Sequence, residues 1–247
     1  MRKQSLMLAV ATAIALLAVP APALAQDLED VLAKHYEAIG GVDAWEGITS
    51  TRMEGTLAID AMGMAMDGPF KLVQKSPAMS RAEFTIQGMS GVMAYDGEMG
   101  WQINPLAGIA TATPVGEAER RQMAEQADIA GPLFNWKEKG HAVELLGTED
   151  VAGTTAYKLK LTVATGEESF YYIDTDSYRA IQTVATRDIQ GAPTQITTHF
   201  EDYKEVGGLV MPHTIEVTNP MFSQTITFTS IEVNPTIDDA VFVMPEK

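Results

Sequence analysis

The chain has 247 residues, with 17 Lys and Arg against 33 Asp and Glu, and its formal net charge is −16 at pH 7. This acidity argues against partners such as nucleic acid and anionic lipid surfaces, because like charges repel. The sequence contains no cysteine, which excludes disulfides and a lipid anchor on a thiol.

The first 25 residues have the pattern of a secretory signal. Arg2 and Lys3 precede a short apolar run at 6–19, and Ala23-Leu24-Ala25 is a small-x-small cleavage site. We expect cleavage after Ala25, export to the periplasm or beyond the cell, and a mature domain over residues 26–247. An uncleaved N-terminal anchor is the alternative, although the run is short for a membrane span.

The mature chain begins with apolar residues at helical spacing. Asp27 is placed to cap a helix, and Glu29 and Asp30 put negative charge in its first turn. The apolar positions recur every three or four residues as far as Ile39, and Gly40-Gly41 ends the pattern. This amphipathic helix is predicted either to cover one end of a sheet or to act as a movable lid.

From Thr49 the period changes to two, which is typical of strands. Met53, Leu57 and Ile59 alternate with polar residues such as Arg52 and Glu54. Further strands are predicted, with short connections that favour a meander, at 70–74, 80–87, 92–95 and 100–104.

Three methionines mark the connection after the first strand: Met62, Met64 and Met66. Thioethers at alternate positions suit a soft metal such as Cu(I). Methionine is frequent throughout this region, however, and adaptable methionine is also what promiscuous apolar sites use. We favour an apolar rim over a metal site.

A second helix is predicted further on. Residues 105–116 are small and suggest a loop, 117–130 have a weak helical pattern, and Gly131-Pro132 stops it. An apolar cluster of Leu133, Phe134 and Trp136 follows. This region is either core packing at the end of a barrel or a second lid.

Strand patterns fill the remainder of the chain. The segment 157–163 alternates apolar and charged residues, and an aromatic strand follows at 169–173. In the last strand Ile226 and Phe228 share one parity, whereas Ile231 and Val233 share the other, which predicts a β-bulge. About eleven strands with two helical insertions favour one mainly β domain, an incomplete and strongly curved antiparallel barrel.

Short motifs along the mature chain carry a resemblance to a known family. They are Ala38-Ile39-Gly40-Gly41, Gly55, Tyr95-Asp96-Gly97 with Trp101, the run 145–153 with Tyr157-Lys158-Leu159, Tyr172-Ile173-Asp174, the run 208–212, Val233-Asn234-Pro235, Ile237-Asp238 and Phe242. In this order they resemble the LolA/LolB-like outer-membrane lipoprotein-sorting superfamily, in its uncharacterised periplasmic branch. The resemblance implies a half-barrel whose concave apolar face is covered by helices. It also implies a carrier of lipid or acylated lipoprotein cargo.

The sequence shows no catalytic signature. His35, His141, His199 and His213 form no close ligand pair, and no GxSxG, Walker or dinucleotide motif occurs. We therefore expect a monomeric binding protein, not an enzyme, with no cofactor or metal. A non-catalytic module for envelope assembly, with a protein partner, is the alternative; an envelope hydrolase ranks last.

The residues expected to contact hydrophobic cargo are chosen only because they alternate with polar residues along the predicted strands. This parity does not say which face of the sheet is concave. These residues are Met53, Leu57, Ile59, Phe70, Leu72, Phe84, Ile86, Trp101 and Ile103.

Overall fold

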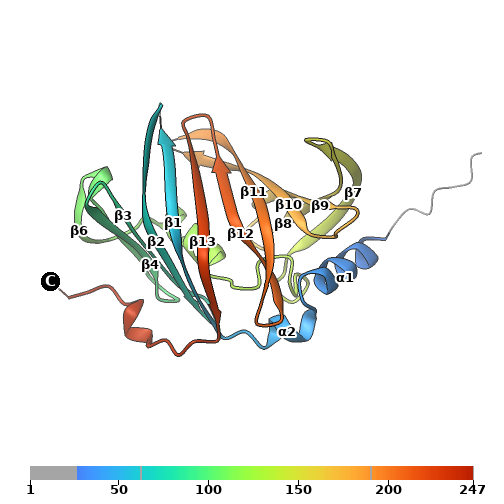
Figure 1. The fold of residues 1–247 in the computed structure, drawn as a ribbon, viewed down its shortest axis with the longest axis horizontal. Coiled ribbons are helices and arrows are strands. Elements are labelled where there is room, and N and C mark those ends of the chain that lie inside the picture. Colours follow the sequence, from blue (N-terminus) through green and yellow to red (C-terminus); the bar gives the residue numbers. More distant parts are fainter. Residues whose placement is uncertain (1–26, 62, 190, 247) are drawn as a thin grey trace, which may run out of the picture.

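A computed structural model describes residues 27–61, 63–189 and 191–246. The expected signal peptide at 1–25 and Met62 of the methionine-rich connection lie outside the described residues. Figure 1 shows one strongly curved sheet, with helices α1 and α2 near one of its ends.

All strands in the described part of the chain belong to one open antiparallel sheet of 13 strands. The N-terminal half contributes β1 (Ser50–Ala61), β2 (Met64–Lys75), β3 (Met79–Ile86), β4 (Met89–Tyr95), β5 (Gly100–Asn104) and β6 (Ile109–Pro114). The C-terminal half contributes β7 (Ala142–Val151), β8 (Thr154–Thr162), β9 (Glu168–Asp174), β10 (Ala180–Ile189), β11 (Ala192–Val206), β12 (Leu209–Thr218) and β13 (Phe222–Val233). Each half is a meander, and β1 pairs with β13 to join the two.

The incomplete barrel is therefore confirmed, with two strands more than the sequence indicated. β6 lies within the expected loop 105–116, where its small residues give no apolar alternation. β7 was missed because its register with β8 shifts between Leu145 and Thr148, and Gly147 has φ 109°. β2 also begins earlier than predicted and includes Met64 and Met66.

The predicted bulge in the last strand is confirmed. The register between β1 and β13 shifts at Glu54/Gly55, so Gly55 pairs with Phe228 while Glu54 pairs with Ser230. A Cβ on Gly55 would lie 2.0 Å from the carbonyl oxygen of Thr227. Only glycine permits this close approach, which bends the sheet at the junction of its two halves.

Three α-helices are described: α1 (Leu28–Ala38), α2 (Val42–Glu46) and α3 (Glu117–Gln126). α1 packs Val31 and Leu32 against a cluster that includes Leu159 and Ile173 of β8 and β9. α3 lies on β3–β5, where the absent side chain of Gly100 leaves room for Met123: a Cβ there would be 2.9 Å from its Sδ. Among the described residues, no helix is long and apolar enough to cross a membrane.

Candidate functional site

One row of apolar side chains crosses the face of the sheet that the helices approach. Phe200 of β11 pairs with Ile215 of β12, Ile215 with Ile226 of β13, and Ile226 with Leu57 of β1. Paired residues in antiparallel strands point to the same face. Leu57 is buried, whereas the other three are half-buried. The row forms the floor of a hollow, and we refer to these four residues as the apolar row.

An aromatic row runs beside it. Phe228 and Phe70 flank Gly55, with ring centroids 6.2 Å apart, and Phe70 pairs with Phe84 of β3. The ring of Phe84 folds over Gly91 of β4, because a Cβ at Gly91 would lie 2.1 Å from its Cζ. The missing side chain of Gly91 thus leaves the space that the ring of Phe84 occupies on this face of the sheet.

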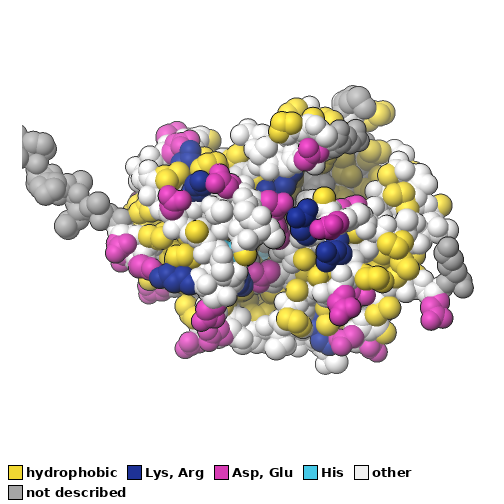
Figure 2. Space-filling model, turned by 180° about the vertical axis from the view of Figure 1, so that it is seen from behind, with side chains coloured by type: hydrophobic (Ala, Val, Ile, Leu, Met, Phe, Trp, Pro, Cys, Tyr) yellow, Lys and Arg dark blue, Asp and Glu magenta, His cyan; other side chains and the backbone are white. Residues whose placement is uncertain are grey.

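A cavity of about 770 Å³ lies between the sheet and the segment that roofs it. Its roof is α3 together with residues 128–141, and its floor comes from β8–β11, including Leu161, Tyr171 and Phe200. Phe200 also belongs to the apolar row, so the cavity continues onto that surface. Figure 2 shows a hollow on one face of the molecule with hydrophobic side chains inside it and charged side chains beside it.

The roof is fixed at one end by buried contacts. Phe134 packs with Met53, Met211 and Phe228 of the sheet, and its ring meets that of Tyr36 edge-on at 5.7 Å. The hydroxyl of Tyr36 donates a hydrogen bond to the carbonyl of Leu133. These contacts bury one end of the roof segment, whereas α3 at the other end is more polar and more exposed.

His35 is a structural histidine at the wall of this cavity. Its Nδ1 is 2.7 Å from the carbonyl oxygen of Tyr178, so Nδ1 carries the proton and donates. Burial lowers the pKa of His35 below its ordinary value. The described residues hold no group of three or more His, Asp or Glu side chains arranged for a metal ion.

Two carboxyl groups meet at the cavity between α3 and the β8–β9 turn. Burial and a hydrogen bond with Glu167 raise the pKa of Glu125 to about 7. Arg187 of β10 lies on the other side, with its Nη2 3.7 Å from Oε2 of Glu125. The contact of Glu125 with Arg187 joins the roof helix to the floor of the cavity.

We expect this contact to make stability depend on pH. The pKa of Glu125 is higher in the folded chain than its ordinary 4.5. The folded state therefore holds the proton more tightly, and the contribution of Glu125 to stability is lost as pH rises from about 4.5 to about 7. Glu125→Gln keeps a neutral side chain, so it should gain stability relative to the wild type as pH rises. Urea unfolding of both proteins at about pH 5 and about pH 8 measures this; a difference that stays constant with pH would contradict it.

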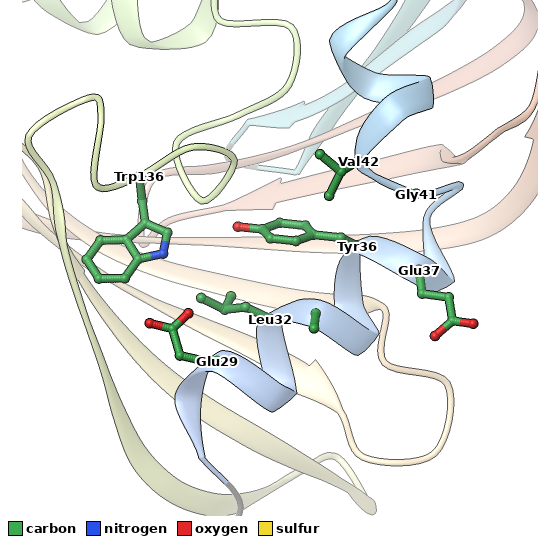
Figure 3. A pocket seen from close by; sticks show the side chains of 8 residues that line it. Glu29, Leu32, Tyr36, Glu37, Gly41, Val42 and Trp136 are labelled. Carbon is green, nitrogen blue, oxygen red and sulfur yellow. The ribbon is translucent and has the colours of Figure 1, made fainter.

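A smaller groove of about 380 Å³ lies between α1 and Trp136. Figure 3 shows Tyr36 and Leu32 of α1 facing Trp136 across it, with Glu29 beside Leu32. Glu29 pairs with Lys137 at 2.6 Å, in an exposed position. The groove is half the size of the roofed cavity and does not reach the sheet's apolar row.

The similarity of this chain to known proteins lies in its fold. No protein-family model and no curated protein matches the sequence. Among solved structures, a LolA superfamily protein from Nitrosomonas europaea superposes with a TM-score of 0.58 at 15% identity, covering 87% of this chain and 96% of that one. A DUF1329 family protein from Desulfovibrio piger also gives 0.58 at 15% identity, covering 85% and 95%. A putative outer membrane lipoprotein-sorting protein domain from Vibrio parahaemolyticus gives 0.56 at 12%, covering 86% and 94%. This chain has the LolA-like fold.

Seven of the nine residues predicted to face cargo lie on the concave face of the LolA-like sheet. The strand registers place them on one side, continuous with the apolar row: Met53, Leu57, Ile59, Phe70, Leu72, Phe84 and Ile86. Met53, Leu57 and Ile86 are buried, and the other four are half-buried. Met64 and Met66 share this face near the end of the β1–β2 hairpin, as a rim would.

Trp101 and Ile103 are the two exceptions, because the structure places them on the opposite, convex face. The registers put Trp101 beside Ala94 and Arg81, away from Phe84. The indole Nε1 of Trp101 donates to the carbonyl of Phe242 at 2.8 Å, and the ring is 1% exposed. The C-terminal segment covers this part of the convex face. The apolar residues of β5 therefore face that segment and not the hollow.

The half of the floor that β8–β13 provide contains none of the nine residues predicted to contact cargo. Phe200, Ile215 and Ile226 sit in recognisable period-two patterns, so each was readable as a strand residue. Their connection to Leu57 depends on the β1–β13 pairing, between residues far apart in the sequence. Only a fixed register brings them into one row.

Proposed function

We propose that this LolA-like chain is a carrier that binds an acyl chain of a lipid or lipoprotein on its concave face. The observation that carries the proposal is the apolar row, which leads out of the roofed cavity and is half-buried in three of its four members. A solid core would bury these side chains fully. A ligand lying on them would cover the apolar surface that remains exposed.

The energetics are sufficient for such a ligand. Each buried methylene contributes about 0.8 kcal/mol, so a chain of myristoyl length could gain on the order of 10 kcal/mol gross. The loss of translational freedom and the ordering of the acyl chain offset a large part of this gain. Micromolar affinity, about 8 kcal/mol, is therefore within reach.

The envelope is the compartment that suits this function. The solved structures that share the fold include the putative outer membrane lipoprotein-sorting protein domain from Vibrio parahaemolyticus. A signal peptide cleaved after Ala25 would deliver the carrier to the periplasm, where a water-soluble vehicle for acyl chains is needed. Its partners would be the lipid or lipoprotein cargo and a protein that donates or accepts it.

Displacement of a fluorescent fatty acid tests the proposal. Delipidated protein should bind the probe at one molecule per chain with a Kd of about 10 µM or tighter, and unlabelled hexadecanoate should displace it. Native mass spectrometry of gently purified protein should show the mass of one bound lipid. A folded protein that neither saturates with the probe nor retains lipid would contradict it.

A further inference from the structure

Basic side chains gather at the roofed cavity of an otherwise acidic protein. Its lining includes Arg120, Arg121, Lys139 and Arg187, against Glu125 and Asp128 among the acids, with Glu167 beside Glu125 as a third. In the whole chain acidic residues outnumber basic ones, 33 to 17. The local balance is therefore reversed, and a low-dielectric wall strengthens the resulting field.

Two of these four bases are held by other parts of the protein. Lys139 lies 2.6 Å from Oδ2 of Asp128 and donates to the carbonyl of Gly131 at 2.9 Å. Arg120 is turned toward the carbonyl of Glu98, with its Nη1 at 3.5 Å. Neither has its charge directed to a ligand.

Arg121 and Arg187 are the bases that remain for a ligand. Arg121 precedes Glu125 by one helical turn on the same face of α3 and lowers its pKa by charge, but makes no ion pair within 4 Å in the described part of the chain. Arg187 donates from Nη1 to the carbonyl of Thr186 at 3.3 Å, but its Nη2 meets Glu125 only at 3.7 Å and can turn to a ligand. Burial and the hydrogen bond with Glu167 raise the pKa of Glu125, so its negative charge opposite Arg187 is reduced at neutral pH.

Hydroxyl groups and an apolar exit complete the site. Thr165, Ser169 and Tyr171 line the same cavity and can donate hydrogen bonds to an oxyanion. Phe200 lines it too and opens onto the apolar row. The same cavity thus contains positive charge, hydrogen-bond donors and an apolar exit toward the apolar row.

We propose that the cavity selects amphiphiles with an anionic oxygen headgroup, a carboxylate or a phosphate, which Arg121 and Arg187 hold while the chain passes Phe200 onto the apolar row. This inference rests on the proposed function and adds a headgroup preference to it. Arginine suits such a headgroup because its planar donors match carboxylate and phosphate oxygens.

Competition against the fluorescent fatty acid with ligands of equal chain length tests the preference. Hexadecanoate and hexadecyl phosphate should bind at least about tenfold more tightly than hexadecanol, as expected for a charge-assisted contact of about 1.4 kcal/mol or more. Inorganic phosphate alone should not displace the probe at millimolar concentration, because it lacks the chain. Equal affinity for hexadecanol, or displacement by free phosphate, would overturn the inference.

Variants assign the preference to the two arginines. The double variant Arg121→Gln with Arg187→Gln should bind hexadecanol as the wild type does and lose most of its preference for the anions. Arg52→Gln, on the convex face and paired with Glu232 at 2.8 Å, is the matched control and should keep the preference. A double variant that keeps it would refute the assignment. If no ligand of this series binds the wild type, the proposed function itself fails; if hexadecanol binds as well as the anions, only the headgroup inference fails.

Discussion

Ile226→Asp is expected to lower the affinity for a fatty acid by at least about 100-fold, or about 2.8 kcal/mol. Ile226 lies in the middle of the apolar row, between Ile215 of β12 and Leu57 of β1. A carboxylate there would lie against the acyl chain without a partner charge, and desolvating it costs more than the methylene contacts return. Titration of the fluorescent fatty acid into each folded protein measures the loss.

The neighbouring residue offers a matched control. Thr227 is in the same strand, is exposed, and points to the convex face because successive strand residues alternate. Thr227→Asp adds the same charge one residue away and should leave the Kd within about twofold of the wild type. Equal losses in both variants, or none in either folded variant, would remove the apolar row from the binding site.

Phe242→Ala is expected to destabilise the fold by about 3–5 kcal/mol, as large-to-small changes of buried aromatics do. Phe242 is fully buried in a cluster with Val73 and Ile237, on the convex side of the sheet. Its loss leaves a cavity beneath the C-terminal segment, which also holds Trp101 through a backbone carbonyl. Urea denaturation followed by Trp fluorescence measures the change.

Two comparisons show whether this cluster is structural or binds ligand. Val243→Ala changes a residue that is 53% exposed and should cost less than about 0.5 kcal/mol. The Phe242→Ala protein, studied under conditions in which it stays folded, should bind the fatty acid with unchanged affinity. Reduced affinity there would instead place ligand in the convex groove that Trp101 and Ile103 line with Val241 and Val243.

Much of the fold is readable from the sequence because strand periodicity is a local property. The alternation around Met53 and Leu57 and the phase change between Phe228 and Ile231 led to a strand and a bulge that the structure contains. β6 and β7 were not readable. The first has only Ala and Thr between Ile109 and Pro114, and the second changes register near Gly147, so neither presents a continuous alternation.

The site is less predictable because it depends on which face of the sheet each apolar side chain lies on. Parity grouped Phe70 with Phe84 correctly, since those strands are joined by a short connection. It failed at Trp101, because the C-terminal segment makes the convex face apolar as well. The contact of Glu125 with Glu167 brings together residues from a helix and a distant turn, which no local pattern encodes.

Photo-crosslinking tests most directly whether the concave face holds the chain. A fatty acid with a diazirine at its terminal carbon, bound to the protein, irradiated and mapped by peptide mass spectrometry, reports where the chain ends. Adducts are predicted on β11–β13 and β1, around Phe200, Ile226 and Leu57. Adducts confined to the convex groove near Trp101, or to the groove between α1 and Trp136, would contradict the account.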